Sequence, residues 1–237
     1  LHEGHLEVEL GELWLAVGAG FGDLAFFFPG ALTLTVMFSA VFSTMSLIDD
    51  RRDGFLLSML VSPAPRFSMV LGKILGSTTL AWMQGLMFLI FLPLTGLRPS
   101  AGALLAAVAL LFLIAFSFTS LGFWIAWRME STQGFHAVMN LALFPLWLVS
   151  GALFPLAGAH GWMQWLMRVN PLTYSLGALR SLLDAGAAAG APALGPGVAV
   201  TAASAAILLA GSALSAQARS CRHGARGMRR ALVLLTL

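Results

Sequence analysis

The chain has 237 residues, of which 59% are hydrophobic and only 10% are charged, and its mean hydropathy is +0.88. Soluble domains carry about 25% charged residues, so this composition excludes a soluble globule and predicts an all-α membrane domain. The net charge of +3 does not indicate nucleic-acid binding, because the basic residues lie between and beyond apolar runs. The single cysteine, Cys221, excludes an internal disulfide and a thiolate metal cluster.

Five apolar stretches approach the length of about 20 residues that a membrane-spanning helix needs. They lie at about residues 24–48, 68–92, 101–127, 135–156 and 197–216. An apolar piece at 12–22 precedes them and is too short to cross a membrane. The sequence therefore predicts about five full transmembrane helices, and we interpret residues 1–23 as the stump of a further, partial first span.

The basic residues predict the orientation of these spans, because Lys and Arg accumulate on the cytoplasmic side of a membrane. With residues 49–66 in the cytoplasm and the spans alternating from there, ten basic residues fall inside and three outside. The inner group is Arg51, Arg52, Arg66, Lys73, Arg128 and five arginines of a basic tail at 217–237; the outer group is Arg98, Arg168 and Arg180. We expect a multi-pass protein of the cytoplasmic membrane with its C-terminus in the cytoplasm.

Groups that could carry out bond chemistry are missing from the sequence. The Gly72-Lys73 pair is followed by Ile74 and lacks the preceding glycines of a phosphate-binding loop, so the chain alone is not expected to bind ATP. We interpret the polar start around His2 and His5 as a solvated end and not as a metal site. The predicted span centres hold no ionisable residue of the kind that ion-coupled transporters use. We expect no catalytic, cofactor-binding or metal-binding residue, and an energy source outside this chain.

Several small and polar residues indicate contacts between helices. Ser68, Gly72 and Gly76 recur every four residues, a spacing that lets two helices approach closely, either within one subunit or between two copies. His136 and Asn140 lie near one end of the fourth predicted span, where a hydrogen bond between helices is favoured over ion binding.

The connection at residues 49–66 is longer than two adjacent spans require. Its acidic start suits the N-terminus of a helix, where carboxylates meet the helix dipole, and two prolines then end that helix. The aspartates are Asp49, Asp50 and Asp53, and the prolines are Pro63 and Pro65. The prediction is a short cytoplasmic helix with an exposed apolar face, which suits a partner protein or a lipid surface equally well.

The segment at residues 155–184 has a different character. Trp162 and Trp165 are residues typical of a membrane interface. Four leucines after Pro171 recur at helical spacing and predict an amphipathic helix near the outer surface. They are Leu172, Leu176, Leu179 and Leu183.

Two parts of the sequence resemble type-2 ABC-transporter permeases, the transmembrane subunits of the daunorubicin-resistance and nodulation type. The first is Arg51-Arg52-Asp53-Gly54, followed by LLSMLVSPAPR and then LGK. The second is SGALFPLAGAHGWMQWLMRVNPLTYSLGALR, from Ser150 to Arg180. The two motifs are separated by the expected number of spans, and the resemblance extends from about Leu13 to the end of the fifth span.

This resemblance implies that the whole chain, 1–237, is a single permease domain, in which residues 49–66 form a coupling loop that contacts the ATPase. It assigns that contact to Arg51, Arg52, Asp53, Gly54, Phe55, Leu56, Met59 and Leu60. The segment at 155–184 would be an outer re-entrant gate. The gate residues would be Phe154, Pro155, Trp162, Trp165, Asn170, Pro171 and Tyr174, of which Asn170 and Pro171 are expected to shape the backbone and not to touch substrate.

The family further implies a dimer of permeases that binds two copies of a separate ATPase subunit, which holds ATP and Mg. The expected function is therefore the membrane subunit of an ATP-driven exporter in a bacterial inner membrane. Uncharged spans favour an amphipathic cargo such as a drug, a lipid or a polysaccharide. Family members have six spans and the first is incomplete here, so a truncated remnant or a membrane scaffold is an alternative. An ATP-independent channel or carrier is a second alternative, against which the lack of buried charge argues.

Overall fold

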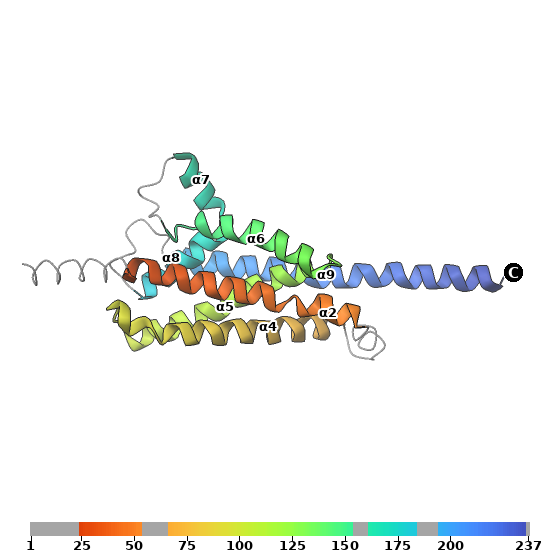
Figure 1. Ribbon diagram of the computed structural model, residues 1–237, viewed down its shortest axis with the longest axis horizontal. Helices are drawn as coiled ribbons and strands as arrows, with labels where there is room; N and C mark the ends of the chain where they lie inside the picture. Colours follow the sequence, from red (N-terminus) through yellow and green to blue (C-terminus); the bar gives the residue numbers. More distant parts are fainter. Residues whose placement is uncertain (1–23, 54–65, 154–160, 184–193, 236–237) are drawn as a thin grey trace, which may run out of the picture. The chain divides into compact units, whose positions relative to one another are not determined.

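The computed structural model describes residues 24–53, 66–153, 161–183 and 194–235, and within the last helix it describes side chains as far as residue 215. Every regular element in these ranges is helical and none is a strand (Figure 1), which confirms the prediction of an all-α protein. A helix over residues 24–43 leads, after a turn at 44–45, into α2. The elements that follow are α2 (Ser46–Arg52), α4 (Arg66–Leu89), η1 (Leu92–Thr95), α5 (Ala101–Ala126), α6 (Thr132–Leu148), α7 (Gly161–Val169), α8 (Pro171–Leu183) and α9 (Leu194–Leu235).

Three stretches among the described residues are long and apolar enough to cross a membrane: Leu24–Arg52, Ala101–Ala126 and Leu194–Ser215. They correspond to the first, third and fifth predicted spans. The second and fourth predicted spans are helices, α4 and α6, but fall short of this standard. Lys73 and Gln84 lower the hydropathy of α4, and α6 has only 17 residues, about 25 Å of helix against a hydrocarbon core of about 30 Å. Their crossing of the membrane remains a prediction.

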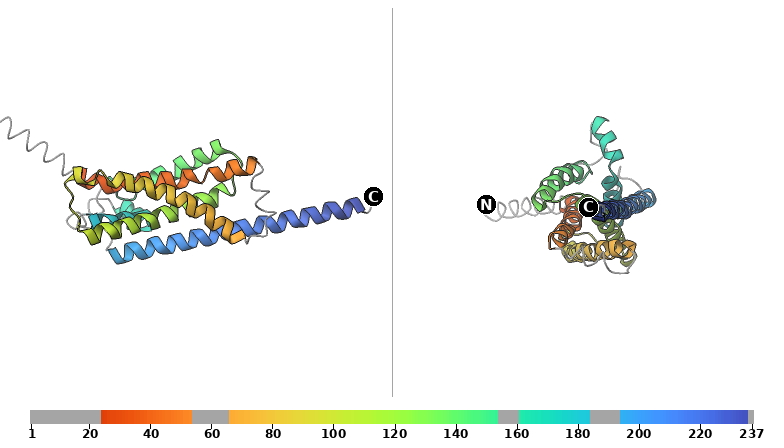
Figure 2. Two further views of the ribbon diagram at one scale, coloured as in Figure 1. Left: turned by 90° about the horizontal axis from the view of Figure 1, so that it is seen from below. Right: turned by 90° about the vertical axis from the view of Figure 1, so that its right-hand side faces the viewer.

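Several element boundaries differ from those predicted. The first predicted span extends through α2 to Arg52 and does not end near Ile48. Pro93 has no backbone N–H to continue an α-helix, and α4 gives way to the 3₁₀ helix η1, which ends at Gly96 with a φ of 76°. The largest difference is α9, which has 42 residues and forms one unbroken helix (Figures 1 and 2). The basic tail is therefore helical as far as Leu235.

The chain folds into two compact units, each assembled from three sequence segments. Unit 1 comprises Leu1–Thr35, Met83–Leu111 and Pro145–Val200, and unit 2 comprises Val36–Trp82, Phe112–Phe144 and Thr201–Leu237. The first helix and α4, α5, α6 and α9 each contribute one portion to each unit.

Close backbone approach at a glycine organises unit 2. The first helix is interrupted at Thr44, whose hydroxyl donates to the Val41 carbonyl oxygen at 2.6 Å. A Cβ atom on Gly122 of α5 would lie 2.7 Å from the Thr44 Oγ1 and 3.1 Å from the Val41 Cα. Only a residue without a side chain lets α5 pack against this turn. Elsewhere in the unit, the Ser212 hydroxyl of α9 donates to the Ser120 carbonyl oxygen at 2.9 Å.

Unit 1 is held by a similar approach near the start of the first helix. The Trp147 Nε1–H of α6 donates to the Gly30 carbonyl oxygen at 2.9 Å. A Cβ atom on Gly30 would meet the Ala152 Cβ at 3.1 Å. Among the described residues, α8 is the most deeply packed short helix of this unit, with nine of its 13 residues buried.

The packing of α8 changes the interpretation of its four leucines. The predicted helix is present, and all four leucines are buried, between 0% and 2% exposed. Polar residues of the same helix, including Thr173 and Ser175, are buried as well. Since α8 has no broad solvent or lipid face, it packs inside unit 1 and does not lie on a surface as an amphipathic helix.

The contacts of His136 and Asn140 also differ from the hydrogen bond between helices that was predicted for them. The Asn140 side chain is exposed on α6 and forms no hydrogen bond with a described residue. The His136 ring lies 4.8 Å from the Phe42 ring, centroid to centroid. The interaction seen at this place is therefore a ring contact with the first helix, and neither side chain forms the expected hydrogen bond with a described residue of another helix.

Candidate functional site

The predicted ATPase-contact residues begin at the end of α2. Arg51, Arg52 and Asp53 are described, while the other five, Gly54, Phe55, Leu56, Met59 and Leu60, lie outside the described residues. Asp49 and Asp50 lie within α2, and Asp53 is its C-terminal cap. The helix that these aspartates were expected to begin falls on residues 54–65, outside the described residues. Asp49 is in the first turn of α2 and both arginines are in its last turn, which complements the helix dipole at each end.

Arg51 binds the connection between α5 and α6. Its Nη2 donates to the Trp127 carbonyl oxygen at 2.9 Å and its Nη1 to the Met129 carbonyl oxygen at 3.1 Å. The guanidinium carbon also lies 5.4 Å from the centroid of the Trp127 ring. Carbonyls at a helix C-terminus lack intrahelical partners, and the planar fork of arginine can satisfy two of them at once.

Arg52 extends this contact by one more carbonyl. Its Nη2 donates to the Glu130 carbonyl oxygen at 3.0 Å, although the side chain itself is exposed. Adjacent arginines on α2 therefore hold three carbonyls of the turn at residues 127–130. We call these two side chains and that turn the arginine clamp.

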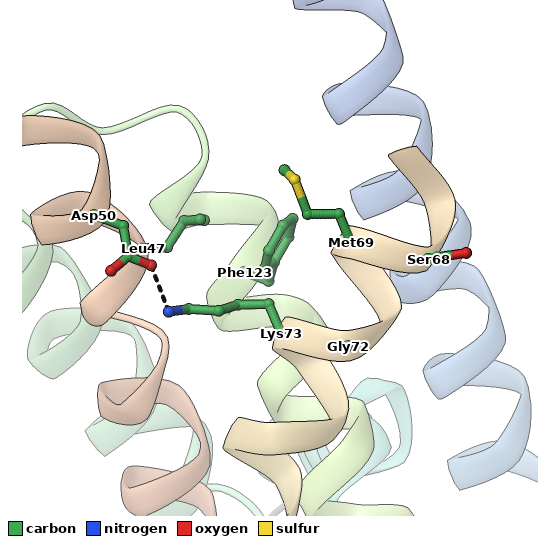
Figure 3. Close-up of a pocket in the computed structure, with 7 residues that line it drawn as sticks. All are labelled: Leu47, Asp50, Ser68, Met69, Gly72, Lys73 and Phe123. Atoms are coloured by element: carbon green, nitrogen blue, oxygen red, sulfur yellow. Dashed lines mark hydrogen bonds and ion pairs between the residues drawn. The ribbon is translucent and has the colours of Figure 1, made fainter. Parts of the chain in front are cut away.

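Asp50 connects the same helix to α4. The Lys73 Nζ lies 2.5 Å from the Asp50 Oδ2, and the two side chains are 32% and 25% exposed. Figure 3 shows the lysine extended from α4 toward the aspartate. Partly exposed ion pairs of this kind contribute about 1 kcal/mol or less to stability. The sequence analysis counted Lys73 only among the cytoplasmic basic residues and missed this partner, which is 23 positions away in the sequence.

A cavity of about 330 Å³ opens beside this ion pair (Figure 3). Its walls come from α2, α4 and α5, all parts of unit 2. The residues that line it are Leu47, Asp50, Ser68, Met69, Gly72, Lys73 and Phe123. Its volume lies within the range of small-molecule sites, about 300–1,000 Å³. Nothing in the sequence singled it out, since its residues lie in three separate segments.

The predicted packing residues of α4 lie at the edge of this cavity. Ser68, Gly72 and Gly76 are all exposed. A Cβ atom on Gly72 or Gly76 would meet no described atom within 4 Å. The described part of this chain therefore provides no helix that packs against these two glycines, and their role at an interface between copies stays a prediction.

The predicted gate residues of unit 1 are split between surface and interior. Trp162 and Trp165 on α7 are 71% and 65% exposed, whereas Asn170 is 6% exposed. The Tyr174 hydroxyl donates to the Arg168 carbonyl oxygen at 3.0 Å. Phe154 and Pro155 lie outside the described residues.

Asn170 and Pro171 shape the backbone, as expected. The Asn170 Oδ1 accepts from the Leu172 N–H at 2.9 Å, the contact of a helix N-cap, and Pro171 is the first residue of α8, where its missing N–H has no cost. The Asn170 Nδ2 donates to the Leu146 carbonyl oxygen of α6 at 2.7 Å. One amide thus satisfies the start of α8 and the end of α6.

Arg180 is the residue that the sequence interpretation missed. It was counted among the outer basic residues, but it is only 6% exposed. Its Nη2 donates to the Ala152 carbonyl oxygen at 3.1 Å and to the Phe26 carbonyl oxygen at 3.4 Å, and its guanidinium carbon lies 4.2 Å from the Phe26 ring centroid. Its Nε has no hydrogen-bond partner among the described residues. Arg180 joins α8 to the start of the first helix and to the turn that follows α6.

The polar groups of both units bind mainly backbone carbonyls. Among the described residues there is no group of three or more His, Cys, Asp or Glu side chains that could hold a metal ion. The arrangements found here fix helix ends relative to one another.

Comparison with known proteins shows which family the chain resembles. A family model described as ABC-2 type transporter matches residues 10–183. The chain is 31% identical over 161 residues to the putative transport permease ycf38 of Cyanophora paradoxa. This alignment covers 67% of this chain and 56% of that protein. It is 28% identical over 178 residues to the daunorubicin resistance ABC transporter permease protein DrrB1 of Streptomyces coeruleorubidus, covering 70% and 61%. The matched regions span about three fifths of each relative.

Proposed function

Because the chain belongs to the ABC-2 type transporter family, we propose that it is the membrane-spanning permease subunit of an ATP-driven ABC exporter. In this proposal a separate ATPase subunit, present in two copies, binds ATP and Mg and supplies the energy. A second permease copy completes the transport path. The cargo is an amphipathic molecule, a class that apolar spans without charged centres suit.

The arginine clamp is the observation that carries this proposal. Residues 54–65 lie in the sequence between two anchored elements: α2, held by Arg51 and Arg52, and α4, held by the Lys73–Asp50 pair. A force applied to that segment by a partner reaches α2 and α4 directly. Through the clamp it also reaches the turn between α5 and α6. A coupling segment needs direct connections to several helices in order to move them, and a passive scaffold does not.

The distribution of basic residues supports the proposed orientation. All ten residues assigned to the cytoplasmic side belong to unit 2, and the three assigned to the outer side belong to unit 1. The coupling loop and the C-terminal end of α9 would then both be in the cytoplasm, where the ATPase is.

Co-purification in a mild detergent tests the partner and its contact. We would compare the native chain with Phe55→Asp, which places a charge on the proposed contact surface. Phe67→Asp is the matched control, since Phe67 lies on the neighbouring helix α4 and is 49% exposed. We expect an ABC-type ATPase to accompany the native chain and the control, and to be lost with Phe55→Asp.

Two results would count against the proposal in different ways. Equal recovery of the ATPase with Phe55→Asp would refute the contact assignment. Absence of any ATPase from the folded native chain would refute the exporter function.

A further inference from the structure

The cavity beside the Asp50–Lys73 pair has no role in the coupling argument, yet it combines two properties of a ligand site. Leu47, Met69 and Phe123 give it apolar walls, and an ion pair lies at its edge (Figure 3). The cavity is bounded by described residues of one unit.

The ion pair retains capacity for further hydrogen bonds. A lysine ammonium has three donors, and the structure uses one of those of Lys73, toward the Asp50 Oδ2. The Asp50 Oδ1 accepts from no described residue. Both side chains are partly exposed, at 32% and 25%. The neighbouring Arg51, by contrast, is directed to backbone carbonyls.

Charge complementarity restricts the class of ligand. An anionic head group alone would meet the Asp50 carboxylate, and a cationic one alone would meet the Lys73 ammonium. A wholly apolar molecule would desolvate the ion pair without compensation. A zwitterion that carries an anion and a protonated amine a few atoms apart can bind both groups without separating them.

The exposed side of α4 adds a path for an apolar chain. Ser68 and Gly72 line the cavity, and Gly76 follows one turn further along the same face. A Cβ atom on either glycine would meet no described atom within 4 Å. The absence of side chains there leaves room for an acyl chain along this face of α4, on which Leu75 is also exposed.

We propose that this cavity binds one phospholipid with a phosphoethanolamine head group. Its phosphate accepts from the Lys73 ammonium, its amine donates to the Asp50 carboxylate, and an acyl chain follows Gly72 and Gly76. The assignment rests on the proposed function only in placing this end of unit 2 at the cytoplasmic leaflet. A lipid held between α2, α4 and α5 fixes the elements next to the coupling segment.

Photolabelling in lipid nanodiscs tests the site. The full chain is reconstituted in nanodiscs doped with a photoactivatable phosphatidylethanolamine or, separately, with a phosphatidylglycerol analogue that has the same acyl chains. Labelled peptides are then identified by mass spectrometry. We expect the ethanolamine lipid to label the peptide containing Met69 at least about fivefold more than the glycerol lipid.

Three variants make the result specific. Met69→Trp fills the cavity without changing charge, and Asp50→Asn removes the amine acceptor; each is expected to reduce the labelling about fivefold or more. Met69→Leu keeps the volume and is expected to label like the native chain. A thermal melt of each variant shows that it is folded, and a variant that is unfolded is replaced by Phe123→Trp, which fills the cavity from α5.

Equal labelling by the two lipids, stronger labelling by the glycerol lipid, or labelling unaffected by Met69→Trp would overturn the proposal. The assay needs no ATPase partner. Its failure is therefore distinguishable from failure of the proposed exporter function, which the co-purification measures.

Discussion

In both units, polar side chains join helices by donating to backbone carbonyls, but the arginine clamp of unit 2 is far more exposed than the contacts of Trp147, Asn170 and Arg180 in unit 1. In unit 1, Trp147, Asn170 and Arg180 are between 6% and 9% exposed. In unit 2, Arg51 is half-buried and Arg52 is exposed. Removing a buried donor leaves its acceptor without water, which costs about 1–3 kcal/mol, whereas an exposed acceptor is rehydrated.

The difference assigns different roles to the two units. The contacts of unit 1 are expensive to break and maintain one arrangement of its helices. The arginine clamp of unit 2 can break and re-form at modest cost, which suits the part of the molecule next to the proposed coupling segment. Three substitutions test this contrast, and their expected effects on stability decrease in the order given.

The largest effect is expected for Arg180→Ala. The substitution removes the partner of the Ala152 and Phe26 carbonyls and leaves a void beside the Phe26 ring. We expect a loss of about 3 kcal/mol in the free energy of unfolding, measured as a lower thermal midpoint in detergent. Arg168→Ala is the matched control, because that side chain is exposed. Equal midpoints for the two variants would contradict the account of unit 1.

An intermediate effect is expected for Asn170→Ala. It removes the N-cap of α8 and the donor to the Leu146 carbonyl oxygen, for a loss of about 1–2 kcal/mol. Asn170→Asp keeps the acceptor for the Leu172 N–H and loses only the donor, so its thermal midpoint should lie between those of the native chain and the alanine variant. If aspartate is as damaging as alanine, the cap does not contribute.

The smallest effect is expected for Arg51→Gln. Because Arg51 is only half-buried, we expect water to replace its guanidinium at the Trp127 and Met129 carbonyls. We expect a loss of about 1 kcal/mol or less. The thermal midpoint should match that of Arg128→Gln, a variant of an exposed arginine in the same connection. A fall as large as that of Arg180→Ala would remove the contrast between the units.

Local patterns in the sequence predicted the features that depend on near neighbours. The helix after Pro171 follows from leucine spacing. The backbone role of the Asn170-Pro171 pair was expected from the family resemblance, and Asn170 caps that helix. Contacts between distant segments were not predictable in this way. The burial of Arg180 depends on Phe26, 154 positions away, and the cavity depends on three segments that meet only in the folded chain.

The positions of basic residues also led to two incomplete interpretations, of Arg180 and of α9. Arg180 was counted only as an outer basic residue, because charge statistics carry no information about burial. The length of α9 was missed for a related reason: the basic residues after 216 were interpreted as a tail. Arginine, alanine and methionine are all good helix formers, and the helix continues through them to Leu235.

The most direct test of the central claim is the coupling of ATP hydrolysis to transport in the complex with its ATPase, reconstituted in liposomes. Arg51→Gln is compared with Arg128→Gln at equal protein and equal ATPase content, and hydrolysis and cargo movement are measured together. The account predicts that Arg51→Gln loses most of the transport per ATP hydrolysed while Arg128→Gln keeps it. If the two variants transport equally well per ATP, the arginine clamp does not transmit the movement, and the claim is wrong.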